Sequence, residues 1–139
     1  MKLSRLYEDA KQHPDPSKMT PREAFNYAHD VIEGRWPEAE PIIMQEPKSA
    51  YWYAQDVIKG PWPEAEETIK KDPEWAYYYA RDVIKDRWPE AEPTIMRDPQ
   101  WWKLYQKDVL EPWQRKQEII KRGEEYQKRT GKLPDEDMF

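Results

Sequence analysis

The sequence predicts an all-α fold: a short α-solenoid of tandem two-helix repeats, each 26 residues long, with N- and C-terminal capping helices. The first observation is that Ala50–Ile58 (AYWYAQDVI) has counterparts 26 residues earlier and 26 residues later. The second is that the motif Trp-Pro-Glu-Ala-Glu keeps this period, beginning at Trp36, Trp62 and Trp88. The third is that prolines recur at the predicted helix starts. A fixed period of this length indicates stacked repeats that bury their apolar faces against their neighbours.

Four parts are predicted along the chain. Residues 1–19 hold a capping helix, from about Leu3 to Gln12, and a loop. Residues 20–111 hold the tandem repeats, three of them complete (24–49, 50–75 and 76–101) and a fourth degraded. Residues 112–131 hold a C-terminal capping helix that covers the last repeat, and residues 132–139 are a loose acidic tail. In the fourth repeat Gln106 replaces a small alanine, as expected where stacking stops.

The longer helix of each repeat begins at a proline, which suits the first helical position because its missing N–H would have no partner there. Thr20, Asp72 and Asp98 precede these prolines and are good N-caps, whereas Glu46 is a weaker one. Thr20 and Glu23 also have the spacing of a capping box.

An apolar stripe on a 3.6-residue period then marks the buried face of this helix. In the second repeat the stripe consists of Ala50, Tyr53, Ala54, Val57 and Ile58. Gly34 and Gly60 are predicted to end the helix, and Asp86 takes this place in the third repeat.

The shorter helix begins near Pro37, Pro63 or Pro89 and ends near Gln45, Lys71 or Arg97. Pro41 and Pro93 lie four residues after the first proline, where a full α-helix would be strained. We therefore expect an irregular or 3₁₀ first turn in these two repeats. The second repeat has Glu67 at this position.

Composition and charge exclude several classes of protein. The mean hydropathy is -1.22, but aromatic residues make up 14% of the chain and can build a core. The absence of cysteine excludes disulfides and thiolate metal sites. The net charge of -5 disfavours nucleic-acid and anionic-membrane binding, although residues 97–132 are locally basic. With no apolar run of membrane-spanning length and no signal-peptide pattern, we expect a cytoplasmic protein.

Residues 20–111 resemble an uncharacterised family of short tandem repeats found in bacterial, phage and large-virus proteins. The pattern that carries the resemblance is Tyr-Ala-x-Asp-Val-Ile, then Trp-Pro-Glu-Ala-Glu, then an isoleucine and a proline. The resemblance implies an α-solenoid of microbial or viral origin, located in the host cytoplasm if viral. It implies no catalytic residues.

Catalytic chemistry finds little support in the residues. The repeated carboxylates would form ladders, which we interpret mainly as structural, because identical groups in every repeat do not build one cleft. They are Asp30, Asp56, Asp82 and Asp108, then Glu38, Glu64 and Glu90, then Glu40, Glu66 and Glu92. His13 and His29 are expected to be exposed. No Gly-rich phosphate loop or metal-binding motif occurs, so we predict no enzymatic activity, no cofactor and no metal.

Aromatic residues at positions that differ between repeats are the first candidate surface, because exposed Trp and Tyr often anchor protein interfaces. These candidates are Tyr51, Trp52, Trp75, Tyr77, Tyr78 and Trp101. For Trp75 and Trp101, filling of space between repeats is the stronger alternative. The C-terminal helix is the second candidate surface, with Arg115, Lys116 and Arg122 as contact residues, although an ordinary capping helix has the same pattern.

The leading hypothesis is a non-catalytic protein-binding repeat module. By analogy with the resembling family, it would be a phage or viral inhibitor or adaptor that acts on a host defence protein. One alternative is a small-molecule binder, with aromatic pockets that hold or sequester a nucleotide. Another is a structural, self-assembling component. Nucleic-acid binding through the C-terminal helix is a weaker possibility. The sequence leaves the identity of the partner and the oligomeric state open.

Overall fold

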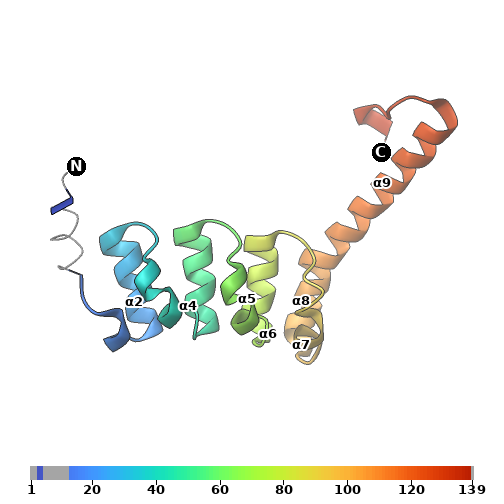
Figure 1. Cartoon of the computed structure of the whole chain (residues 1–139). Coiled ribbons are helices and arrows are strands. Elements are labelled where there is room, and N and C mark those ends of the chain that lie inside the picture. Colours follow the sequence, from blue (N-terminus) through green and yellow to red (C-terminus); the bar gives the residue numbers. More distant parts are fainter. Residues whose placement is uncertain (1–2, 5–12, 139) are drawn as a thin grey trace. The chain divides into compact units, whose positions relative to one another are not determined.

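The computed structural model of the protein describes residues 3–4 and 13–138 (Figure 1). The predicted N-terminal capping helix, Leu3–Gln12, lies outside the described residues except for Leu3 and Ser4. Every element of the described residues is a helix, so the all-α prediction is confirmed. The chain folds as two compact units, unit 1 (residues 1–69) and unit 2 (residues 70–139).

Unit 1 holds the first two repeats. The first repeat consists of α2 (Pro21–Tyr27), the π-helical segment η2 (Ala28–Ile32), the 3₁₀ turn η3 (Pro37–Ala39) and α3 (Glu40–Ile43). The second consists of α4 (Pro47–Trp52), the π-helical segment η4 (Tyr53–Ile58) and α5 (Pro63–Ile69). A 3₁₀ turn, η1 (Pro16–Lys18), precedes them and contacts η3. Because α2 contacts both α3 and α4, the longer helices of the two repeats lie side by side (Figure 1).

Unit 2 holds the third and fourth repeats. The third repeat consists of α6 (Pro73–Tyr79), the π-helical segment η5 (Ala80–Ile84) and α7 (Glu92–Met96). The fourth consists of α8 (Pro99–Tyr105) and the π-helical segment η6 (Gln106–Leu110), and it leads directly into α9 (Glu111–Thr130). A 3₁₀ turn, η7 (Glu136–Met138), follows. Both α6 and α7 contact α8, which repeats the side-by-side packing seen in unit 1.

The predicted helix starts agree with the structure. Thr20 and Glu23 form a capping box with two reciprocal hydrogen bonds of 3.1 Å. Asp72 and Asp98 accept hydrogen bonds from backbone N–H groups of the first turns of α6 and α8. Glu46 makes no such cap bond, as expected of the weakest cap in the set.

The helix ends differ from the prediction by one residue. The left-handed residues are Glu33, Lys59 and Lys85, with φ of 58°, 62° and 59°, whereas Gly34 and Gly60 do not have positive φ. In the first three repeats the longer helix widens into a π turn before it stops, and the N–H after the left-handed residue bonds back to a buried alanine carbonyl. For Gly60 this bond to the Ala54 carbonyl is 3.1 Å long. The glycine therefore follows the stop and is not the residue that makes it.

The expectation for the shorter helices is confirmed. In the first repeat a 3₁₀ turn precedes α3, and in the third repeat residues 89–91 form a turn before α7 begins at Glu92. In the second repeat α5 is α-helical from Pro63 onward. The difference follows the prolines: Pro41 and Pro93 have no N–H for the i→i−4 bond, whereas Glu67 has one.

The core combines small residues with large aromatic ones. Alanines of the longer helices, Ala24, Ala28, Ala50, Ala54, Ala76 and Ala80, have no exposed surface, which permits close helix approach. Trp36, Trp62 and Trp88 from the second half of each repeat are buried, and so are Ile43, Ile69 and Ile95. Gln106, at the fourth alanine position, is exposed, in agreement with its predicted place at the end of stacking.

The fourth repeat lacks the stop of the other three. Glu111 has φ −61° instead of a left-handed conformation, and the next residue is Pro112. Proline has no N–H to donate to the alanine-position carbonyl, so this end motif cannot form. The helix instead continues through η6 into α9, which extends away from α7 and α8 (Figure 1).

The C-terminal helix was expected to cover the last repeat. In the structure α9 has no buried residue; it contacts η6, which precedes it, and Trp113 in its first turn lies against Arg87. The tail that follows turns back along α9, where a Cβ added to Gly123 would lie 3.5 Å from Cγ of Pro134.

Candidate binding surface

A hydrogen-bonded cluster joins the two repeats of unit 1. The Tyr53 hydroxyl accepts a 2.8 Å hydrogen bond from the backbone N–H of Trp36 and donates one of 2.9 Å to Oε2 of Glu40. Arg35 donates two further bonds to Glu40, of 3.1 and 2.6 Å. The Tyr53 ring also packs on Trp62 of its own repeat, with ring centroids 4.8 Å apart. One tyrosine thus binds the preceding repeat with its hydroxyl and its own repeat with its ring.

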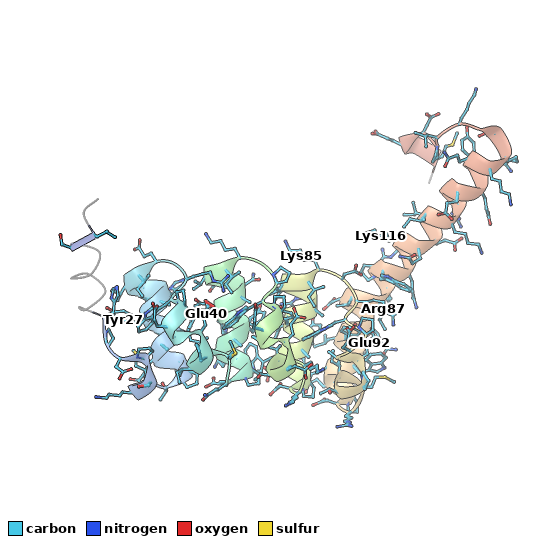
Figure 2. All side chains as sticks on the ribbon, viewed as in Figure 1. Tyr27, Glu40, Lys85, Arg87, Glu92 and Lys116 are labelled. Atoms are coloured by element: carbon cyan, nitrogen blue, oxygen red, sulfur yellow. The ribbon has the colours of Figure 1, made fainter. Side chains whose placement is uncertain are left out.

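Unit 2 contains the same cluster. The Tyr105 hydroxyl accepts a 2.9 Å bond from the Trp88 N–H and donates one of 2.7 Å to Glu92. Arg87 and Glu92 lie close together (Figure 2), and Arg87 binds Glu92 through Nε and Nη2, at 3.1 and 2.7 Å. The Arg87 guanidinium also lies 4.6 Å from the ring centre of Trp113 at the start of α9. These recurring contacts explain why Tyr, Trp and Glu recur at fixed spacing.

The electrostatics of the cluster keep its groups in their bonded forms. Burial alone would raise the pKa of Glu40, but the hydrogen bonds from Arg35 and Tyr53 outweigh it and hold that pKa below its ordinary value. Glu92 has a lowered pKa for the same balance of reasons. Burial, with the neighbouring carboxylate, raises the pKa of Tyr53 and of Tyr105. Glu40 and Glu92 are therefore ionised structural acceptors.

His13 contacts two aromatic residues of the first repeat, Tyr27 and Trp36. Tyr27 occupies the position of Tyr53 and Tyr105, and its hydroxyl lies 2.8 Å from Nδ1 of His13. The His13 ring also makes edge contacts with Tyr27 and Trp36. The expectation that His13 is exposed is thus wrong, because it occupies the place where a preceding repeat would bind. His29 is exposed as expected, 2.7 Å from Asp30.

The predicted aromatic residues of unit 2 form one cluster. Tyr78 packs against Trp75, Tyr77 and Trp101, with ring centroids 5.2 to 5.5 Å apart. The Arg81 guanidinium lies 5.2 and 5.0 Å from the ring centres of Tyr77 and Tyr78. Trp75, Tyr78 and Trp101 are half-buried. For Trp101 the packing supports the alternative that it fills space between repeats.

Two of the predicted contact residues face inward. Tyr77 is 2% exposed, and its hydroxyl donates to the Asp108 carboxylate of the next repeat. Burial and this carboxylate raise the pKa of Tyr77 to about 12. Tyr51 is 4% exposed. The idea that both tyrosines contact a partner is therefore wrong for the folded chain, because a position that varies between repeats can still lie between packed helices.

Trp52 is the most accessible predicted aromatic, at 37% exposure. It stands at the edge of a hollow of about 350 Å³ in unit 1, between α2 and α4. Phe25, His29, Ser49 and Asp56 also line this hollow. Sequence reasoning identified Trp52 but not the hollow, which results from small side chains at Asn26 and Ser49.

The repeated aspartates have different surroundings in each repeat. Asp30 is exposed beside His29, Asp82 forms an ion pair of 2.7 Å with Arg81, and Asp108 accepts from Tyr77. Asp56 is half-buried in the wall of the hollow. The aspartates thus share a sequence position without forming one continuous acidic site.

The predicted basic residues of α9, Arg115, Lys116 and Arg122, are exposed. Arg122 pairs with Glu118 at 3.1 Å, an i,i+4 contact between two well-exposed groups that contributes little stability. Lys116 lies near the start of α9 (Figure 2) and borders a second hollow of about 190 Å³, with Asp108 and Trp113. Charges of both signs alternate along the rest of the helix.

Within residues 3–4 and 13–138, no group of three or more His, Asp or Glu side chains could hold a metal ion. In the same part of the chain, no helix has both the length and the apolar character that a bilayer span requires.

The fold and its recurring cluster define the chain as an all-α helical-repeat protein. Comparisons with protein-family models, with curated proteins and with solved structures find no match.

Proposed function

We propose that this chain is a non-catalytic protein-binding module, in which the recurring clusters form the scaffold and the positions that differ between repeats form the contact surface. The observation that carries the proposal is the exposed indole of Trp52 beside the hollow of unit 1. Tryptophan is one of the residue types most enriched among the residues that dominate binding energy at protein interfaces. The hollow combines aromatic side chains, Phe25 and Trp52, with polar and charged groups that can fix the orientation of a bound group.

The resemblance of residues 20–111 to repeats of phage and large-virus proteins supports one extension of this proposal. The partner would be a host protein, and the chain would act as an inhibitor or adaptor. This extension depends on analogy alone and determines which lysates are tested first.

The test begins with capture of a partner from host lysate on the immobilised full chain. The captured protein is then purified, and its affinity is measured by calorimetry for the parent chain and for Trp52→Ala. We expect Trp52→Ala to weaken binding by about 30-fold, the effect of losing one dominant contact of about 2 kcal/mol. Ile119→Ala, an exposed apolar residue of α9, is the matched control and should leave the affinity unchanged.

Two results would contradict the proposal: no stoichiometric protein partner, or equal affinities of the parent chain and Trp52→Ala. Weakening by Arg115→Ala, Lys116→Ala or Arg122→Ala, with no effect at Trp52, would move the contact surface to α9.

The volume of the hollow supports a second candidate function, the binding of a small ligand such as a nucleotide. About 350 Å³ falls within the range of roughly 300–1,000 Å³ that ligand pockets occupy. A thermal-shift panel of nucleotides and metabolites tests this candidate, because a ligand that binds the folded chain raises its melting temperature. A panel without any shift would remove it.

A further inference from the structure

The two units provide an internal comparison of the same packing site. In unit 2 the space between α6 and α8 is filled by the rings of Tyr77, Tyr78 and Trp101, whose centroids lie 5.2 to 5.7 Å apart. The residues 52 positions earlier, in unit 1, are Phe25, Asn26 and Ser49. In unit 1, α2 pairs with α4 as α6 pairs with α8 in unit 2. Unit 1 nevertheless lacks the indole of Trp101 and the phenol ring of Tyr78, and the hollow lies where these rings would be.

A hydrogen-bond donor is missing from unit 1 as well. In unit 2 Asp108 accepts a bond from the Tyr77 hydroxyl. The equivalent residues in unit 1 are Asp56 and Phe25, and phenylalanine has no hydroxyl. Asp56 is half-buried in the wall of the hollow, and no described residue donates a hydrogen bond to it or forms an ion pair with it. A partly desolvated carboxylate without a donor is a favourable place for an incoming N–H or O–H group.

The remaining walls fit an aromatic ring. Phe25 and His29 pack together, with ring centroids 5.7 Å apart, and Trp52 supplies an exposed indole at the edge. Arg22 and Lys48 in the wall are matched by Glu46 and Asp56, so the formal charges of the wall balance and an uncharged ring fits it. Rings that meet at an angle, as Tyr77, Tyr78 and Trp101 do in unit 2, add to the stabilisation that burial provides.

We propose that the hollow of unit 1 binds a tryptophan side chain of a partner protein. The inserted indole would occupy the place that Trp101 takes in unit 2, and its N–H would donate to Asp56. This inference rests on the proposed protein-binding function, which it deepens by naming the chemistry of the contact. The chain thus completes its own aromatic cluster in one unit and leaves the other to be completed by its partner.

The direct test uses N-acetyl-tryptophanamide as a probe, with N-acetyl-phenylalaninamide as a probe that has a ring but no donor. Binding to the ¹⁵N-labelled full chain is followed by two-dimensional NMR. We expect shifts of the Ser49 and His29 amides and of the Trp52 indole N–H, with a dissociation constant on the order of millimolar for one side chain. The phenylalanine probe should bind about tenfold more weakly, because it leaves Asp56 without a donor.

Three variants locate the site. Ser49→Trp places in unit 1 the residue that unit 2 carries at position 101, and it should fill the hollow and abolish probe binding. Ser49→Ala is the matched control and should bind the tryptophan probe as the parent chain does. Asp56→Ala should remove the preference for the tryptophan probe over the phenylalanine probe. Circular dichroism and the melting temperature confirm that each variant is folded, and Asp56→Ala keeps the test decisive if Ser49→Trp does not fold.

The inference is overturned if Ser49→Trp binds the probe as well as the parent chain, if the two probes bind equally, or if the shifts lie outside unit 1. It is also overturned if a nucleoside binds the hollow more tightly than the tryptophan probe. A purified partner separates this inference from the proposed function. If the partner binds the parent chain and Ser49→Trp equally, protein binding stands and the tryptophan site fails. If the probe binds but no protein partner exists, the site binds a tryptophan side chain and the proposed protein-binding function fails.

Discussion

The hydroxyl of Tyr53 lies 2.9 Å from Oε2 of Glu40, a residue 13 positions earlier in the chain and in a different repeat. The side chain of Tyr53 has no exposed surface, and the same hydroxyl accepts from the Trp36 N–H. Tyr105 and Glu92 reproduce this relationship at 2.7 Å in unit 2. The contact between repeats is therefore made by buried hydrogen bonds as well as by apolar packing.

Tyr53→Phe should destabilise the folded chain by about 1–3 kcal/mol, because it leaves the buried Trp36 N–H without an acceptor and removes a donor from Glu40. Urea unfolding measured by circular dichroism gives the free energy of unfolding. Tyr126→Phe on α9 is the control: this tyrosine is half-buried, and its hydroxyl has no bond to a described residue. Its effect should stay within about 0.5 kcal/mol. Equal effects of the two substitutions would show that the cluster contributes nothing specific.

The stability of the chain should fall in acid, and Glu40 should contribute to that fall. Its pKa in the folded state lies below the ordinary value of 4.5, so the folded state favours the ionised form. The resulting stabilisation is fully present above pH 4.5 and is lost as the pH falls through the lowered pKa. The urea midpoint should therefore drop below pH 4.5, and it should drop less steeply in Glu40→Gln, which has no charge to lose. An identical acid dependence of both proteins would contradict this assignment.

Lys59→Gly should stabilise the chain, whereas Gly60→Ala should do no harm. Lys59 has a left-handed backbone with φ 62°, which costs a residue with a side chain about 1 kcal/mol relative to glycine. Gly60 is not left-handed, and a Cβ added there meets nothing within 4 Å. Thermal unfolding of the two variants compares them directly. A lower melting temperature for Gly60→Ala, with no gain from Lys59→Gly, would mean that the glycine makes the helix stop.

Gly123→Ala should increase the helicity of α9, because alanine favours a helix interior over glycine by roughly 0.8–1 kcal/mol. The added Cβ would meet Cγ of Pro134 at 3.5 Å, an ordinary contact distance. The gain is read from the ellipticity at 222 nm and from slower amide exchange on either side of residue 123. Faster exchange there would mean that the contact with Pro134 needs glycine.

The repeat period predicted most of the fold because the residues that recur make the contacts that recur. The alanine stripe, the buried tryptophans and the helix caps follow directly from identity at 26-residue spacing. The 3₁₀ turn before α3 follows from Pro41, since the lack of an N–H is a local property. The π turns at the ends of the longer helices have no such signal, because widening a helix requires no particular side chain. The sequence therefore predicts Gly60 as the helix stop, whereas in the structure Lys59 has the left-handed conformation.

The candidate site was less predictable, because the hollow exists where unit 1 has smaller side chains than unit 2. Trp52 could be recognised as variable and aromatic, but Tyr51 has the same description and is buried. The hollow follows only from comparison of Ser49 with Trp101 and of Phe25 with Tyr77, once the packing of unit 2 shows what those larger residues fill. Single sequence positions do not reveal a cavity, since a cavity is a property of several side chains together.

The bond from Tyr53 to the preceding repeat also sets an order of events during synthesis. A ribosome releases the chain from its N-terminus, so Trp36, Glu40 and Arg35 emerge before the tyrosine that satisfies them. Until residue 53 has left the exit tunnel, the Trp36 N–H has no Tyr53 hydroxyl to bind, and the Arg35–Glu40 ion pair is not covered by Tyr53. The third repeat stands in the same relation to the fourth, because Trp88 and Glu92 emerge before Tyr105, the residue that binds both of them.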